Sequence, residues 1–344
     1  PASCAFEAFF ILSAEISCIY RKAGKTRRVH CLVYVPDFES AMRISRALSR
    51  IGNVKSDGRP ILGLDAKELL RITLNECPSA VFIPAHVWTP HFSVFGGAYG
   101  FDCLEECFED LTPHIHAIET GLSSNPLMNR QISALDHLGL VSNSDAHSPS
   151  KLGREATIFE CDLSYDGIRS AIESGKGIAG TIEFFPEEGK YHYDGHRSCK
   201  VRLAPEDTFL RNNICPVCGK AVTIGVLNRI EKLSDRDGSV SYPSWSPPFH
   251  SLIPLNEIIG EVLGIGSGCK KVNVLYRRIL EEMGDEFSVL MEAPLADIES
   301  VASRALGEAI SRVRSGNVHI TPGFDGQFGS IRIFTDEERR KWSH

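Results

Sequence analysis

The sequence predicts an α/β protein built on a parallel sheet or barrel, followed by a small cysteine-containing module and an α+β C-terminal region. Three observations support this prediction. Short apolar strands alternate with helices of about ten residues up to residue 185, which is the pattern of β/α units. Two cysteines three positions apart, Cys215 and Cys218, follow this region. Beyond Gly238, a segment rich in Pro and Ser leads into helical patterns and two short strands.

Length and composition describe an ordinary globular protein with more than one domain. The 344 residues exceed the roughly 100 to 200 of a typical domain, and we expect domains at 1–188, 189–240 and 241–344. Hydrophobic content of 42% and charged content of 24% are unremarkable. The net charge of -7 gives no overall attraction to nucleic acid or to an anionic membrane, but it allows a local basic surface. No run of about 18 apolar residues suggests a membrane-spanning helix.

Cysteine usage favours a reducing compartment. The chain has 11 cysteines, an odd number, and eight of them show no spacing typical of a disulfide framework. Such thiols are usually buried apolar groups in cytoplasmic proteins, so we expect a cytoplasmic location. The eight are Cys4, Cys18, Cys31, Cys77, Cys103, Cys107, Cys161 and Cys269.

Apolar runs, and the residues that interrupt them, predict the first two strands and the first helix. Phe9–Leu12 is a continuous apolar run that reaches Ser17, and Val29–Val35 is a second strand. The segment Arg21–Arg28 between them holds five basic residues and a glycine, so it predicts an exposed hairpin loop. Apolar residues at helical spacing predict a helix over Glu39–Ile51, which the following glycine closes.

Further strands and helices alternate up to residue 184. The expected strands are Ala80–Ala85, Ile115–Ile118, Leu140–Ser142 and Ile178–Phe184, and the expected helices are Asp65–Leu74, Asp102–Leu111, Pro126–Gly139 and Tyr165–Ile172.

Several metal-ligating side chains follow these apolar runs. In β/α folds the reactive groups lie at the carboxyl ends of the strands. Asp145 and His147, in the stretch SNSDAH, follow one strand, although alone they are equally compatible with a turn that has a capping Asp and an exposed His. Glu15, His86 and Glu119 also follow apolar runs, which favours one shared site for a polyvalent metal. His30 lies near the start of its strand and is the exception among the candidate ligands.

This donor set indicates hydrolytic chemistry. Imidazoles mixed with carboxylates, without thiolates, suit zinc, manganese or iron rather than calcium. Two or more such ions bridged by a carboxylate can generate hydroxide and hold both oxygens of an in-line phosphoryl displacement. We therefore infer phosphoester hydrolysis, with amide or lactam hydrolysis as the competing interpretation. His91, His114 and His116 fit outer or surface positions better, and Arg59 is either a phosphate ligand or an exposed turn residue.

Cys215 and Cys218 form a zinc knuckle by sequence. His196 and Cys199, also three apart and ending 16 positions before Cys215, are the expected partner pair, with His192 as a substitute. A redox pair would be expected beside a βαβ pattern, and none surrounds it. Between residues 190 and 236, nine Lys plus Arg face five Asp plus Glu, which suggests that the phosphoester belongs to a polynucleotide. The alternative is a zinc ribbon that serves folding alone.

The C-terminal region combines helices with two strands. We expect helices over Pro254–Leu263, from Lys270 onward, and over Pro294–Val313. The GIGSG turn before Lys270 and Lys271 either binds a backbone phosphate or joins two helices as a hairpin. Short strands are expected over Val318–Ile320 and Ser330–Phe334, around the glycine-containing loop TPGFDGQFG.

Eight stretches together resemble the endonuclease Q family. They are ILSAEIS, KTRRVH, SDGRPILGLD, IPAHVWTPHFS, ETGLSSNPLMN, SNSDAHSPSKLGREA, ICPVCGKAVTIGVLNRIEKLSDR and TPGFDGQFG. The resemblance spans nearly the whole chain. It implies a polymerase-and-histidinol-phosphatase (PHP) domain with a distorted, TIM-like β/α barrel, followed by a zinc-binding domain and a C-terminal domain. It also implies a DNA repair endonuclease that cleaves on the 5′ side of deaminated bases such as uracil and hypoxanthine, or of abasic sites.

The resemblance assigns roles to residues of this chain. It implies catalytic roles for Glu15, Asp145 and His147, and two or three divalent ions (Zn²⁺, Mn²⁺ or Mg²⁺) in the PHP centre besides the structural Zn²⁺. Extrusion of the damaged base would need a nearby pocket. Ser13, Arg59 and the loop 121–125 are the candidates by proximity. The implied PHP ligands are Glu15, His30, His86, Glu119, Asp145 and His147.

Damaged double- or single-stranded DNA is the expected partner, with Arg59, Ser13, Lys270 and Lys271 as candidate substrate-binding residues. A replication clamp or other repair proteins are candidate protein partners, no membrane is expected, and the expected location is the cytoplasm, in association with the nucleoid. A PHP domain normally begins with an HxH motif, which is not found before Glu15. We therefore expect a weakened or partly empty metal centre with low activity in this chain. The alternatives are a catalytically degenerate nucleic-acid-binding PHP protein and a small-molecule phosphoesterase.

Overall fold

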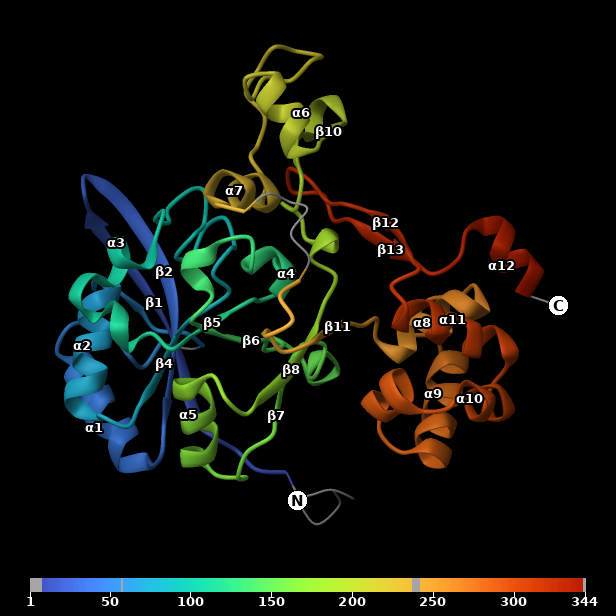
Figure 1. Cartoon of the computed structure of the whole chain (residues 1–344), viewed down its shortest axis with the longest axis horizontal. Helices are drawn as coiled ribbons and strands as arrows, with labels where there is room; N and C mark the ends of the chain where they lie inside the picture. The colour runs from blue at the N-terminus through green and yellow to red at the C-terminus, as the bar shows by residue number, and fades with distance from the viewer. Residues whose placement is uncertain (1–7, 57, 237–241, 343–344) are drawn as a thin grey trace. The chain divides into compact units, whose positions relative to one another are not determined.

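The computed structural model describes residues 8–56, 58–236 and 242–342 (Figure 1). The chain divides into two compact units whose segments alternate along the sequence. The first unit comprises Pro1–Ser142, Thr157–Ala179 and Arg229–Pro247, and the second comprises Asn143–Ala156, Gly180–Asn228 and Pro248–His344. Both strands and helices occur throughout, so the predicted α/β character is confirmed. Closure into a barrel and the predicted domain boundaries stay predictions.

A long antiparallel hairpin forms the first sheet. Strands β1 (Leu12–Lys22) and β2 (Lys25–Val35) pair along their whole length and form the long blue ribbon in Figure 1. Ala23 and Gly24 make the two-residue turn with φ of 51° and 73°, the left-handed geometry that matches strand twist in tight hairpins. The predicted hairpin is therefore confirmed, but its exposed loop over Arg21–Arg28 was wrong, because all five basic residues of this segment lie within the paired strands.

The sheet has the order β3-β1-β2-β4 and mixed strand directions. Strand β4 (Val81–Pro84) pairs antiparallel with β2, and β3 (Ile61–Leu62) pairs parallel with β1. A fully parallel sheet was thus the wrong expectation for this part, although β5 (Ala117–Glu119) and β6 (Gly139–Val141) do pair in parallel.

The apolar run at residues 9–12 was also misread. Strand β1 begins only at Leu12, and the side chains of Phe9 and Phe10 are 63% and 91% exposed. The buried part of β1 is Ile16–Cys18, because only the centre of the strand is covered by the core. A side-chain pattern cannot reveal where the pairing partner of a strand ends.

Helices α1 (Phe38–Ser49) and α2 (Ala66–Glu76) were predicted within a few residues. Asp37 accepts a hydrogen bond from Ser40 N, and Asp65 accepts one from Lys67 N, so each helix has a side-chain N-cap. Helix α5 (Tyr165–Ser174) likewise begins at a serine cap and ends at a left-handed glycine. A core cluster of the first unit comprises Val81, Ile83, Ala117, Val141, Ile172 and Ile178.

Two predicted helices are shorter than expected. The segment Asp102–Leu111 forms α3 (Leu104–Phe108) followed by the 3₁₀ helix η1 (Glu109–His114). The segment Pro126–Gly139 forms α4 (Pro126–Asn129) and the 3₁₀ helix η2 (Ser133–Leu135). Between these two helices, the guanidinium of Arg130 donates to the carbonyl oxygens of Leu135 and Leu138.

The second unit contains a small module and a group of helices. Helices α8 (Leu255–Leu263), α9 (Lys270–Met283), α10 (Leu295–Val301) and α11 (Arg304–Arg314) form one group (Figure 1). The predicted single helix Pro294–Val313 is two helices, because Ala302 leaves helical geometry and Ser303 caps the second one at Leu306 N.

The remaining elements are short. They are β7 (Ala156–Phe159), β8 (Ile178–Glu183), β9 (Asp194–His196), β10 (Val201–Leu203), β11 (Phe249–Ser251), β12 (His319–Thr321), β13 (Ser330–Arg332), α6 (Pro205–Leu210), α7 (Val226–Leu233), α12 (Asp336–Trp342), the 3₁₀ helices η3 (Pro149–Lys151), η4 (Pro186–Glu188) and η5 (Arg197–Cys199), and the π-helix η6 (Ser288–Glu292). No helix among the described residues has the length and apolarity that crossing a membrane requires.

Candidate functional site

Three predicted ligands of the PHP centre converge in the first unit. One ligand atom from each of Glu15, His30 and His86 lies within 4.8 Å of the others. Glu15 Oε1 is 2.9 Å from His30 Nδ1 and 3.3 Å from His86 Nε2, and the two imidazole nitrogens are 3.1 Å apart. Two nitrogens and a carboxylate oxygen at this spacing fit a divalent transition metal.

The hairpin register explains how Glu15 and His30 meet. His30 lies opposite Ser17 on β1, so His30, Ser17 and Glu15 project from the same face of the sheet. Both ligands lie inside their strands, so placing Glu15 at a carboxyl end was wrong. His86 fits the strand-end rule better, because it follows β4, and the N–H of its neighbour Ala85 donates to His30 O at 3.0 Å.

Glu119 supports His86 through the backbone. It is the last residue of β5, is 4% exposed, and its Oε2 accepts a hydrogen bond from His86 N at 2.7 Å. Glu119 is not part of the three-residue ligand group that the described residues form. Thr89 Oγ1 lies 3.0 Å from His86 Nδ1, and the Phe92 ring stacks on His30 with centroids 4.6 Å apart. Sequence reasoning missed these last two, although both follow His86 within one short loop.

Burial and hydrogen bonds shift the pKa values of Glu15 and His30. Burial acts to raise the pKa of Glu15, but hydrogen bonds with His30, His86 and Arg59 outweigh it and hold that pKa well below its usual range. Burial lowers the pKa of His30, which its contact with Glu15 only partly opposes, and this shift favours the neutral imidazole that can donate a lone pair to a metal. Arg59 Nη1 lies 2.7 Å from Glu15 Oε2, which fits its predicted place near the ligands. Ser13 is exposed, two residues before Glu15 on the same strand.

Asp145 and His147 belong to a segment of the second unit. Their side chains are exposed, and His147 Nδ1 lies 2.8 Å from Asp145 O. Asp145 has a φ of 44°, and Arg154 Nε donates to the adjacent Ser144 O at 2.8 Å, which fixes the turn. Their membership of one centre with Glu15 therefore stays a prediction.

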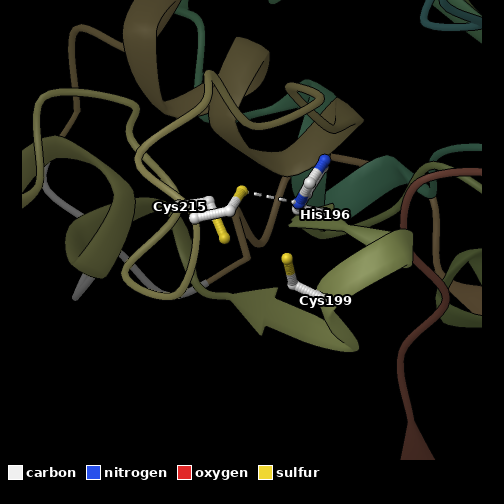
Figure 2. Close-up of side chains that lie close together, drawn as sticks. His196, Cys199 and Cys215 are labelled. Carbon is white, nitrogen blue, oxygen red and sulfur yellow. Dashed lines mark hydrogen bonds between the residues drawn. The ribbon is translucent and has the colours of Figure 1, made fainter.

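Four residues converge in the small module, as predicted for the zinc knuckle. One ligand atom from each of His196, Cys199, Cys215 and Cys218 lies within 4.8 Å of the others. Figure 2 shows the side chains of His196, Cys199 and Cys215 grouped around one point, and Cys218 Sγ is 3.4 Å from His196 Nδ1. Three sulfurs and one imidazole form a donor set that suits a tetrahedral structural zinc. The proposed substitute, His192, is outside this group of described residues.

The knuckle turn prepares Cys215 to be a thiolate. Gly219 N donates to Cys215 O, and Cys215 N donates to Lys220 O, which closes the loop. Burial acts to raise the pKa of Cys215, but the backbone amides of Cys218 and Val217 and contacts with Cys218 and His196 lower it to about 6. All cysteines in the described parts of the chain are free of disulfides.

The module has little apolar core of its own. Its described cluster consists of Leu203, Cys215 and Val222, with Cys199 and Val201 packed against it. So small a core cannot stabilise a fold alone, which is the usual situation for a structural metal. Asp325 adds a polar anchor that sequence reasoning missed, since it accepts hydrogen bonds from Arg197 N and Thr223 Oγ1, both at 2.6 Å.

Gly121 is required for the position of His86. Its φ is +59°, and a Cβ there would lie 2.4 Å from His86 Cβ. Gly121→Ala is therefore expected to displace His86 and lower the free energy of unfolding by about 2–4 kcal/mol, measured by urea denaturation. Gly63→Ala is the control, because its Cβ would meet no atom within 4 Å. Equal stability of the two variants would contradict this role of Gly121.

The second unit also contains a cavity of about 370 Å³. Arg154, which holds the Asp145 turn, is on its wall together with aromatic and amide side chains. Lys151, another wall residue, lies 3.3 Å from Glu257 Oε1. The other principal wall residues are Leu152, Asn256, Tyr276, Phe287 and Leu290.

Glu188, in the same unit, gives stability a pH dependence. Burial, and then the charge of Glu257, raise its pKa from 4.5 to about 7, while Lys151 opposes the shift. A raised folded pKa stabilises the protein fully below pH 4.5, and this contribution is lost as the pH rises through 7. Glu188→Gln is expected to raise the free energy of unfolding at pH 8 by about 1–2 kcal/mol, allowing for solvent screening. The exposed Glu206→Gln is the control; an unchanged pH profile in Glu188→Gln would refute the assignment.

Fold and site together define a mixed α/β protein with a histidine–carboxylate cluster in one unit and a cysteine–histidine cluster in the other. The chain belongs to the endonuclease Q family. It is similar to the lesion-specific endonuclease PfuEndoQ from Pyrococcus furiosus, with a TM-score of 0.81 and 31% identity over 95% of this chain and 81% of that one. A structure of endonuclease Q with a 27-mer duplex carrying an abasic lesion at the active site gives a TM-score of 0.80 and 32% identity, covering 95% and 80%.

The chain is also similar to two uncharacterized proteins. Uncharacterized protein MJ0043 of Methanocaldococcus jannaschii is 34% identical over 252 residues, which is 71% of this chain and 31% of that protein. Uncharacterized protein YqxK of Bacillus subtilis is 29% identical over 311 residues, 88% of this chain and 74% of that protein. Residues 254–317 match the family described as the MJ0043 C-terminal domain, which corresponds to the group of helices α8 to α11. The chain thus spans less than a third of the length of the archaeal relative.

Proposed function

We propose that this protein is a metal-dependent DNA repair endonuclease that hydrolyses the phosphodiester 5′ to deaminated bases, such as uracil and hypoxanthine, or to abasic sites. The observation that carries the proposal is the convergence of Glu15, His30 and His86. The similarity of this protein to a lesion-specific endonuclease supports damaged DNA as the substrate class.

The proposed centre uses Glu15, Asp145 and His147 as catalytic residues and is completed by His30, His86 and Glu119. Two or three bound divalent ions (Zn²⁺, Mn²⁺ or Mg²⁺) would supply an activated water and neutralise charge on the phosphoryl group. Glu15 orients both imidazoles, and Glu119 fixes the backbone of His86. Arg59 is placed to contact the phosphate once Glu15 has a metal partner.

The rest of the chain holds and positions the DNA in this proposal. The Cys215 module binds a structural zinc. Lys270 and Lys271 are exposed at the start of α9, after a turn in which Gly264 ends α8 in the left-handed conformation, a geometry that serves both a helix hairpin and a phosphate contact. Ser13 lies beside the proposed centre. The PHP-type barrel, the domain boundaries, and a replication clamp or other repair proteins as partners remain predictions.

Incubation of the chain with duplexes that contain one uracil, hypoxanthine or abasic site tests the proposal. We expect a nick directly 5′ to the lesion in the presence of Mg²⁺, Mn²⁺ or Zn²⁺, no nick in the matched intact duplex, and loss of nicking in Asp145→Asn. Metal content per chain, beyond the zinc of the Cys215 module, tests the expectation that the PHP centre is incomplete. Lesion binding without nicking would instead favour a catalytically degenerate DNA-binding protein, and activity confined to small phosphate esters would favour a phosphoesterase.

A further inference from the structure

Arg28 shares a sheet face with the ligand cluster. It precedes His30 by two positions on β2, so both side chains project to the same side of the strand. The register places Arg28 opposite Ile19 and His30 opposite Ser17, on the face that also bears Glu15. The guanidinium of Arg28 therefore lies on the same face of β2 as the proposed metal ligand His30, two residues away.

Two aromatic rings hold the guanidinium of Arg28. Its Cζ atom lies 4.2 Å from the centroid of the Tyr99 ring and 5.4 Å from that of the Phe92 ring. The Phe92 ring also stacks on His30, at 4.6 Å between centroids. Cation–π contacts of this kind restrict the orientation of a guanidinium without consuming its N–H donors. Phe92 thus connects the cation to the ligand cluster.

The loop that carries both rings is fixed by its own backbone. Phe95 N donates to Val87 O at 2.9 Å, and Gly100 N donates to Gly96 O at 2.8 Å. Ser93 Oγ donates to Thr89 O at 2.5 Å, beside the contact of Thr89 with His86. The rings are therefore positioned before any ligand arrives, which reduces the entropy lost on binding.

Arg28 has no anionic partner among the residues that the structure describes. Its side chain forms no ion pair there, and its buried Nε atom has no hydrogen-bond acceptor. Neighbouring arginines differ, since Arg27 donates to Gly100 O and Arg59 pairs with Glu15. A partly buried, unpaired guanidinium costs free energy that an oxyanion would recover, and two phosphate oxygens match its paired N–H groups.

We propose that Arg28, held by Phe92 and Tyr99, binds a backbone phosphate of the substrate DNA next to the scissile one. The inference rests on the proposed function, which supplies DNA as the ligand. Arg28 acts here as a binding and positioning residue, since it neither touches the candidate metal ligands nor supplies a proton.

Salt-dependent binding of the full chain to a fluorescent duplex with one abasic site tests this assignment. We expect Arg28→Met to weaken binding about tenfold and to reduce the slope of log Kobs against log[salt] by about 0.9, the value for one lost phosphate contact.

Arg28→Lys keeps the charge and is expected to keep the slope. Tyr99→Leu removes a supporting ring and is expected to weaken binding about threefold with an unchanged slope. Arg21→Met, an equal charge change at an exposed site of the same hairpin, is the control and is expected to leave both quantities unchanged.

Kinetics on the same duplex separate this inference from the proposed function. If the wild type nicks the lesion, Arg28→Met should raise KM about tenfold and change kcat less than about threefold. Unchanged slope and KM in Arg28→Met, or an equal loss in Arg21→Met, would overturn the role of Arg28 while the nuclease proposal stands. If the wild type binds without nicking and Arg28→Met still lowers the slope, the nuclease proposal fails and the phosphate contact stands. Displacement of DNA by inorganic phosphate at constant ionic strength, equally in wild type and Arg28→Met, would also overturn it.

Discussion

Replacing Glu15 with glutamine is expected to slow lesion nicking by about 10²- to 10⁴-fold, because the amide cannot supply the negative charge that a divalent ion requires. The same change removes the acceptor that Arg59 and both imidazoles share, so the geometry of the cluster is weakened as well. Single-turnover cleavage of a uracil or abasic duplex measures the first effect. Metal content after dialysis measures the second, with an expected loss of affinity of at least about tenfold.

Glu39→Gln is the matched control for Glu15→Gln. Glu39 is an exposed carboxylate on α1 that pairs with Arg43 at i+4, so the loss of its charge should leave nicking and metal content unchanged. If Glu15→Gln nicked at the wild-type rate with normal metal content, Glu15 would not be a ligand. The cluster would then be a structural hydrogen-bond network, and the degenerate alternative would gain support.

The candidate site could be predicted from sequence only where one strand end or one short turn determines it. His86 and Glu119 follow apolar strands and were found in that way. His30 was predicted as a ligand from the family resemblance alone, because it lies inside β2. Its position beside Glu15 depends on the hairpin register, which pairs His30 with Ser17. Arg28 was assigned to a loop for the same reason. Register depends on partners distant in sequence, and a single-strand pattern does not encode it.

In the fold, the starts of helices were predicted better than their lengths. Helices α1 and α2 were predicted because their aspartate caps lie in the sequence next to them. Helix α4 ends at Asn129, because the next residue, Arg130, leaves helical geometry, and the Arg130 guanidinium binds the carbonyl oxygens of Leu135 and Leu138. The break between α10 and α11 had a local cue in Ser303, whose capping role was overlooked within a long apolar pattern.

Replacing Cys215 with serine is expected to release the structural metal and unfold the module around β9 and β10. Serine is a poor zinc ligand at neutral pH, whereas the low pKa of Cys215 suits it to bind as a thiolate. The module buries few apolar side chains, so it depends on metal binding for its stability. In small zinc modules that binding free energy, about 10–16 kcal/mol, is largely folding free energy. We expect zinc content to fall by one equivalent, with an early unfolding transition in thermal denaturation.

Cys161→Ser provides the comparison, because Cys161 is an exposed thiol with no ligand partner by spacing. It should retain the zinc and the wild-type transition. A chelator should reproduce the Cys215→Ser transition in the wild type, since both remove the same metal. Retention of one zinc equivalent by Cys215→Ser at wild-type affinity would show that His196, Cys199 and Cys218 bind without it. Because Cys215 is buried, such a result would mean that its side chain belongs to the apolar cluster of the module with Leu203 and Val222 and is not a zinc ligand.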